Sequence, residues 1–98
     1  MRILRQGDIL LKEIKQIPKG LKKKDNILAY GEVTGHKHKL VGNARVLIDN
    51  NGRQFIDVVE SSDLQHEEHH NLVVDIGKYE IIQQREYDVV EGIRQVMD

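Results

Sequence analysis

The chain has 98 residues, of which 39% are hydrophobic and 32% are charged, with one proline and no tryptophan. This length suits a single domain, residues 1–98, and the composition excludes a disordered chain. Because the sequence has no cysteine, it excludes disulfides and thiolate metal sites. The net charge of −1 provides no global attraction for nucleic acid, although most lysines and arginines lie in residues 1–45.

The first residues, Met1 to Arg5, are not followed by the apolar segment of a signal peptide, and no apolar run reaches the length of a membrane span. We therefore expect a cytoplasmic protein with no membrane partner. A core this small, built from Ile, Leu and Val, is marginal. A bound metal ion or self-association as a homo-oligomer would add stability.

Short apolar stretches with an alternating pattern predict β-strands. In chain order they cover residues 9–14, 27–33, 36–40, 44–49, 54–60, 72–75 and 78–83. Pro18 and Gly20 indicate a basic loop between the first two strands. Gly35 interrupts the second strand, so residues 36–40 are expected to continue it after a β-bulge. The pattern breaks again at Ser61, Ser62 and Asp63.

The strongest local signal is Asn50-Asn51-Gly52, because Asn and Gly tolerate the positive φ of a tight hairpin turn. Towards the C-terminus, Asp88 is expected to cap a short helix over residues 89–96. Together these elements predict a mostly β fold, namely a small antiparallel β-barrel or sandwich with a short C-terminal helix.

Five histidines form two clusters, with none elsewhere: His36, His38, His66, His69 and His70. On a strand, His36 and His38 project from the same face, because side chains alternate. A helical turn would put His66, His69 and His70 on one face, whereas a strand would put His66 and His70 together. If the clusters meet, His36, His38, His66 and His69 supply three or four ligands for a divalent metal such as zinc, manganese or nickel.

Three interpretations of these histidines stay open. A metal would lower the pKa of its bound water to about 7, and Glu67 or Glu68 would take the proton in a hydrolysis. Without metal, one basic and one acidic histidine cleave RNA through its 2′-hydroxyl. The third interpretation is that the histidines are solvated turn residues without chemistry. The HExxH motif of zinc proteases is absent.

Arg85 and Tyr87 stand in a polar segment that follows the last predicted strand. Arg85 is a candidate clamp for a phosphate or carboxylate, and Tyr87 is a candidate proton donor. The alternative is an ordinary strand end, with Arg85 solvated and Tyr87 covering the core.

Three sequence blocks occur in a fixed order: Gly-Glu-Val-Thr-Gly-His-Lys-His at 31–38, His-Glu-Glu-His at 66–69 and Gln-Arg-Glu-Tyr at 84–87. Together they resemble a family of short hypothetical proteins from bacteria and phages, over nearly the whole chain. No activity is established for that family. The resemblance therefore implies only that six residues belong to one shared pattern: His36, His38, His66, His69, Arg85 and Tyr87.

The first hypothesis for the function is a histidine-centred, metal-dependent hydrolase that acts on a phosphoester such as RNA or a nucleotide. In it, Glu67 or Glu68 is the base and Arg85 binds the anion. The alternatives are a metal-free acid–base ribonuclease and a non-catalytic binding module or oligomeric adaptor. The last alternative follows from the short chain, which leaves little room for both a core and a deep pocket.

Overall fold

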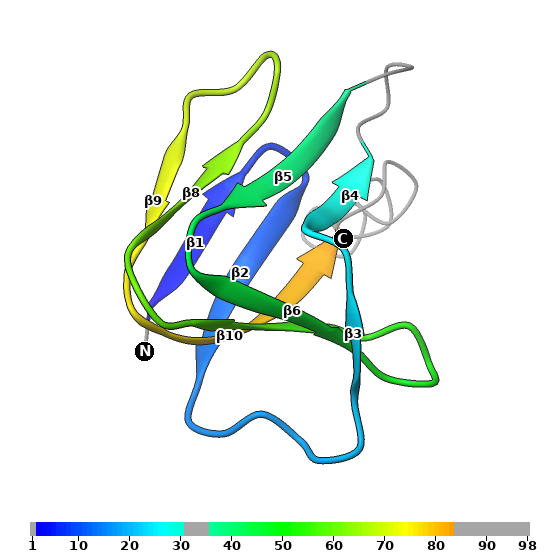
Figure 1. The fold of residues 1–98 in the computed structure, drawn as a ribbon. Helices are drawn as coiled ribbons and strands as arrows, with labels where there is room; N and C mark the ends of the chain where they lie inside the picture. Colours follow the sequence, from blue (N-terminus) through cyan, green and yellow to red (C-terminus); the bar gives the residue numbers. More distant parts are fainter. Residues whose placement is uncertain (1, 31–35, 84–98) are drawn as a thin grey trace, which may run out of the picture.

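The computed structural model describes residues 2–30 and 36–83, which form an all-β structure (Figure 1). In chain order its strands are β1 (Ile3–Gln6), β2 (Ile9–Ile14), β3 (Lys22–Lys24), β4 (Ile27–Tyr30), β5 (Lys37–Val41), β6 (Ala44–Ile48), β7 (Gln54–Val58), β8 (Ser62–Gln65), β9 (Leu72–Val74) and β10 (Gly77–Gln83). No helix long and apolar enough to cross a membrane occurs among these residues.

The strands form two antiparallel sheets. The larger sheet has six strands in the order β1-β2-β10-β7-β6-β3, and the smaller has four in the order β4-β5-β8-β9. In Figure 1 the four-stranded sheet occupies the upper half of the view, and β3, β6 and β10 lie below it. Both sheets contribute to one core, so the two sheets pack against each other.

Aliphatic side chains and one tyrosine build the core, because the strands alternate inward and outward positions. In β10, for example, Tyr79 and Ile81 are buried whereas Lys78 is exposed. The Tyr79 hydroxyl donates a hydrogen bond to the carbonyl oxygen of Asp75 at 2.9 Å, so its polar atom has a partner inside the protein. The buried cluster is Ile9, Leu11, Leu28, Ala29, Leu40, Val46, Ile56, Val58, Leu64, Val74, Tyr79 and Ile81.

The predicted fold class, a small barrel or sandwich with a C-terminal helix, was wrong. The sheets do not close into a barrel: within the described residues, β1 and β3 are the edges of one sheet and β4 and β9 the edges of the other. Residues 2–30 and 36–83 contain no helix. The helix expected after Asp88 lies outside the described residues, as does the bulge expected at Gly35.

The strands predicted from alternation are confirmed, with shifts at their ends, but three strands were missed. These are Ile3–Gln6, Lys22–Lys24 and Ser62–Gln65. The three lysines were assigned to a loop, yet they pair with β6 as an edge strand, where lysine protects the exposed backbone. Ser62 was expected to break the pattern, but it lies buried beside Leu64 on the inner side of β8.

The predicted hairpin between residues 44–49 and 54–60 is confirmed, with Ile48 paired to Gln54. Its turn differs from the expected one, because Gly52 has a φ of 87° and no non-glycine residue among those described has a positive φ. The loop is therefore longer than a two-residue turn, and Asp49 closes it. The Asp49 carboxylate accepts hydrogen bonds from the backbone N–H groups of Asn51 and Arg53.

Candidate functional site

The pairing of β5 with β8 brings the two histidine clusters together. Lys39 pairs with Gln65 in an antiparallel register. Counting along this register from the ends of the strands places His38 opposite His66, and residues that oppose each other share a face. The backbone N–H of Lys37 donates to the Glu67 carboxylate at 2.9 Å, so the segments stay adjacent beyond the ladder.

Four imidazole rings consequently lie in contact. The ring centroids of His38 and His66 are 4.4 Å apart, and those of His66 and His69 are 4.6 Å apart. His36 meets His66 edge-on at 5.7 Å, and His38 and His69 stack at 6.2 Å. Residues some thirty positions apart in the sequence thus form one group, which we call the histidine cluster.

His38 is the buried member of the cluster, and both its ring nitrogens have partners. Its side chain is 1% exposed. Nδ1 lies 2.9 Å from Oε1 of Gln6, and Nε2 lies 2.9 Å from Oδ1 of Asp8. The Gln6 amide nitrogen donates to the carbonyl oxygens of Leu64 and His70, so its Oε1 is the atom left for His38. These bonds join the two sheets across the core.

The protonation of His38 decides whether this network is complete. Both of its partners, Gln6 Oε1 and the Asp8 carboxylate, are acceptors, and a neutral imidazole carries only one N–H. Burial lowers the pKa of His38, whereas the hydrogen bond to Asp8 acts in the opposite direction. Partial burial raises the pKa of Asp8, but hydrogen bonds from Gln83 and His38 outweigh it, so the pKa of Asp8 stays below its usual value.

His36 and His66 lie nearer the surface, and Glu68 contacts both. The backbone N–H of Glu68 donates to Nδ1 of His66 at 3.1 Å. The proton of a neutral His66 is therefore on Nε2. The Glu68 carboxylate lies 3.7 Å from Nδ1 of His36, whose side chain is 22% exposed. At this distance the carboxylate is within ion-pair range of the ring but not within hydrogen-bond range.

Gly7 makes room for the cluster in the turn between β1 and β2. Its φ is +59°, in the left-handed region, and a Cβ built there would lie 2.6 Å from Nε2 of His69 and 3.3 Å from Cε1 of His38. A side chain at this position would therefore suffer both backbone strain and a clash. Gly7, like Gln6 and Asp8, was not predicted as part of the site.

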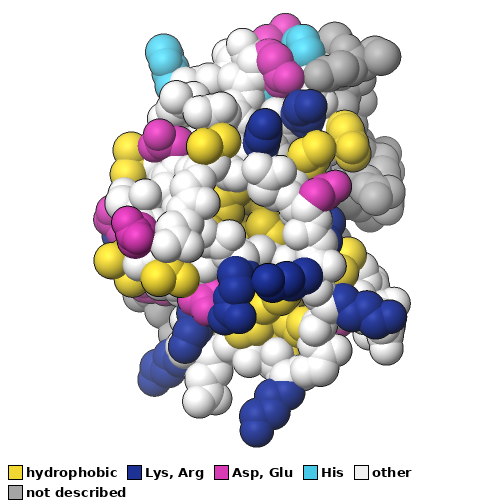
Figure 2. Space-filling model, in the orientation of Figure 1, with side chains coloured by type: hydrophobic (Ala, Val, Ile, Leu, Met, Phe, Trp, Pro, Cys, Tyr) yellow, Lys and Arg dark blue, Asp and Glu magenta, His cyan; other side chains and the backbone are white. Residues whose placement is uncertain are grey.

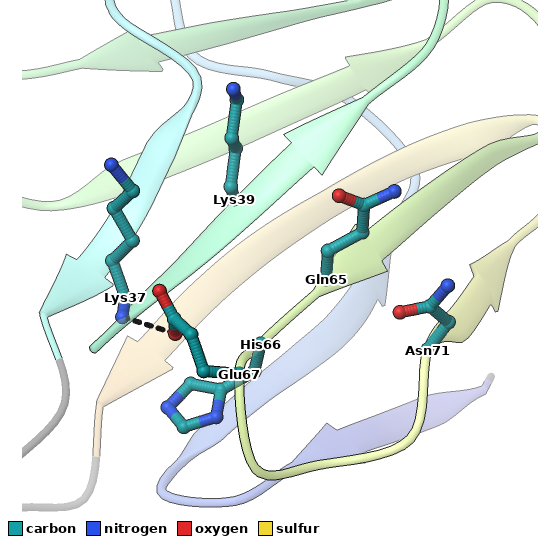
Figure 3. Close-up of a pocket in the computed structure, with 6 residues that line it drawn as sticks. All are labelled: Lys37, Lys39, Gln65, His66, Glu67 and Asn71. Atoms are coloured by element: carbon teal, nitrogen blue, oxygen red, sulfur yellow. Dashed lines mark hydrogen bonds between the residues drawn. The ribbon is translucent and has the colours of Figure 1, made fainter.

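A shallow hollow of about 460 Å³ adjoins the cluster, lined by Lys37, Lys39, Gln65, His66, Glu67 and Asn71. Figure 3 shows Lys37 and Lys39 projecting from β5 towards the same side. The hydrogen bond from the Lys37 backbone is the main cause that lowers the pKa of the exposed Glu67 carboxyl. His66 is the one histidine that both lines this hollow and contacts the other rings.

Comparison with known families supplies the identity of the chain. Residues 5–84 match the model of a family described as a domain of unknown function, DUF8820. The chain belongs to this family. Comparisons with curated proteins and with solved structures gave no significant match. The expected membership of an uncharacterised family is thus confirmed, whereas the three sequence blocks remain predictions.

The match to DUF8820 includes the whole histidine cluster and its buried partners. Arg85 and Tyr87 lie outside the described residues.

As metal ligands, the four predicted histidines are unequally suited, because His38 would have to release Gln6 and Asp8 to bind an ion. No group of three or more His, Asp or Glu side chains in residues 2–30 and 36–83 is placed to hold a metal.

Proposed function

We propose that this DUF8820 protein cleaves RNA by metal-free acid–base chemistry at the exposed edge of the histidine cluster. The observation that carries the proposal is the position of His66, which belongs both to the cluster and to the hollow with two lysines. Imidazoles for proton transfer and ammonium groups for charge stabilisation are the combination that cleavage of a phosphodiester requires.

In this proposal His36 is the general base. Its Nδ1 faces the carboxylate of Glu68 at 3.7 Å, so Glu68 acts as a positioning residue for the ring. The opposite nitrogen, Nε2, is then the one that takes a proton from a substrate hydroxyl. A positioned imidazole contributes typically 10²–10⁴-fold to such a reaction.

His66 and the lysines stabilise negative charge. Because Nδ1 of His66 accepts the Glu68 backbone N–H, its Nε2–H is a donor for a phosphoryl oxygen. Lys37 and Lys39 line the same hollow as His66, and in this proposal their ammonium groups offset the charge that develops on phosphorus.

The reaction balances without a co-reactant. His36 removes the proton of the 2′-hydroxyl, a bond forms between O2′ and phosphorus, and the bond between phosphorus and O5′ breaks. A proton from solvent passes to O5′, and His36 returns the proton that it took to solvent. The products are a 2′,3′-cyclic phosphate and a 5′-hydroxyl, and no water is consumed in this step.

The metal-dependent version of the site competes with this proposal. For a zinc, manganese or nickel ion, His38 is the least available of the four predicted ligands, because its nitrogens are bonded inside the protein. Glu68 would then be the nearest carboxylate to His36. Cleavage in the presence of EDTA separates the two versions, because chelation abolishes only the metal-dependent one.

The test uses a fluorescent single-stranded oligoribonucleotide containing all four bases, incubated with the protein in EDTA. We expect cleavage to a 2′,3′-cyclic phosphate, and a loss of about 100-fold or more on His36→Ala substitution. The matched control is His70→Ala, since His70 is an exposed histidine of the same loop without a ring contact to the cluster among the described residues.

The proposal is contradicted if cleavage persists in His36→Ala. It is also contradicted if His36→Ala and His70→Ala lose cleavage activity to the same extent. Activity that appears only when zinc, manganese or nickel is added selects the metal-dependent version. Absence of cleavage under every condition leaves the non-catalytic binding module as the function to pursue.

A further inference from the structure

The outer face of the four-stranded sheet carries a row of polar and aromatic side chains. Tyr30 of β4 pairs with Lys37 of β5, and Lys39 pairs with Gln65 of β8. Paired residues share a face, and residues two apart on a strand share it too, at a spacing of about 6.6–6.8 Å. These four side chains therefore stand together on one surface, which we call the outer face.

The opposite face of the same strands is the core side. Ala29 pairs with His38, and both are buried, as is Leu40. The alternation therefore assigns Tyr30 and the lysines to the outer face by the same register that buries the intervening residues. Figure 2 shows histidine, acidic and basic side chains gathered at the upper end of the view, where β5 and β8 lie in Figure 1.

We propose that the outer face binds single-stranded nucleic acid, with a base stacked on Tyr30 and the backbone phosphates on Lys37 and Lys39. The inference rests on the proposed function for its link to RNA, and it deepens that function by naming the single strand as the substrate form. His66, which follows Gln65, lines the hollow at the end of this face, and its ring turns to the other side of the strands, where it packs on His38.

An exposed aromatic ring is the first argument for this occupant. Tyr30 is 65% exposed, whereas tyrosine side chains are on average intermediate in burial. A ring on an open sheet surface is a stacking platform, and stacking tolerates any base because every base has a π-face. Duplexes hide these faces within their own stack, so the ring selects for unpaired bases.

The charge on the outer face is the second argument. Within residues 2–30 and 36–83, neither the Lys37 nor the Lys39 ammonium forms an ion pair with a carboxylate. Among the residues that the structure describes, the one acidic side chain lining the hollow is Glu67, which instead accepts the backbone N–H of Lys37. Both ammonium groups thus remain available for phosphate oxygens.

The shape and polarity of the hollow are the third argument. Its volume of about 460 Å³ lies within the range of small-molecule sites, of about 300–1,000 Å³, and suits a single nucleotide. Gln65 and Asn71 line it with amide groups, which can donate to and accept from base edges.

The experiment measures binding of a fluorescent 2′-O-methyl oligoribonucleotide by anisotropy. This probe lacks the 2′-hydroxyl nucleophile, so binding is separated from cleavage. We expect Tyr30→Ala to weaken binding about 10-fold, and Lys39→Ala to reduce the slope of log K against log salt by about 0.7. The controls are Ile76→Ala, which removes an equally exposed apolar side chain, and Lys12→Ala, which removes an exposed lysine of the other sheet.

Equal binding by the wild-type protein and Tyr30→Ala, or equal affinity for a single strand and its duplex, overturns the inference. Loss of cleavage in His36→Ala with binding retained supports both proposals. If cleavage depends on His36 but the probe binds equally well to wild-type protein and to Tyr30→Ala, only the proposal that the outer face binds the strand is overturned. Probe binding without any cleavage overturns the proposed ribonuclease alone.

Discussion

His36 immediately precedes β5 and His38 is the second residue of that strand, yet their surroundings differ in almost every respect. His38 is 1% exposed, and both its nitrogens are bonded to groups from the β1–β2 turn. His36 is partly exposed, and its nearest charged partner is the exposed Glu68. The comparison teaches that an HxH pair on one face need not act as a unit. One histidine connects the sheets, and the other is available for chemistry.

The largest expected difference between the two is in stability. His38→Ala leaves a cavity and removes the hydrogen-bond donor that faces Gln6 and Asp8, so we expect a loss of about 3 kcal/mol in the free energy of unfolding. His36→Ala removes a partly exposed ring and should cost less than about 0.5 kcal/mol. Urea denaturation of both variants measures the contrast. Equal losses would show that the two histidines have the same structural role.

Gly7 provides the next test, because its lack of a side chain leaves space beside His38 and His69. Gly7→Ala should lower the free energy of unfolding by about 2 kcal/mol through strain and the clash with His69. Gly20→Ala is the matched control, since Gly20 also has a positive φ but no atom within 4 Å of the added Cβ. If thermal denaturation shows the same loss in both variants, backbone strain alone accounts for Gly7.

Asp8 gives the smallest and most specific effect. Asp8→Ala removes an acceptor of His38 and of Gln83, and should cost about 1–2 kcal/mol. Asp8→Asn should cost less at neutral pH, because an amide N–H can donate to Nε2 of a neutral His38 while the amide oxygen still accepts from Gln83.

The pH dependence of Asp8→Asn sharpens this prediction. The pKa of Asp8 is lower in the folded protein than its ordinary 3.8, so its stabilising contribution is present above that value and is lost as pH falls through the folded pKa. The Asn variant lacks this part of the acid sensitivity. The measurement is acid unfolding of wild type and Asp8→Asn. Equal slopes of the two curves below pH 4 would contradict the role assigned to Asp8.

Alternation in the sequence predicted most of the strands, and it did so where inward and outward positions differ clearly in polarity. It failed for Lys22–Lys24, which is a strand because β6 offers it an open edge. It failed again at Ser62, whose burial is tolerated because its hydroxyl donates to the carbonyl oxygen of Glu60. In both places long-range pairing overrides a local pattern.

The candidate site divides in the same way. The sequence by itself determined that titratable rings come in two clusters and that His36 and His38 share a face, because strand geometry depends only on neighbouring residues. Only the tertiary structure decided that the clusters meet, since the β5–β8 register is set by packing of the two sheets. It also decided that Gln6, Gly7 and Asp8 surround His38, because a β-turn brings them there from thirty residues away and no local pattern records such a contact.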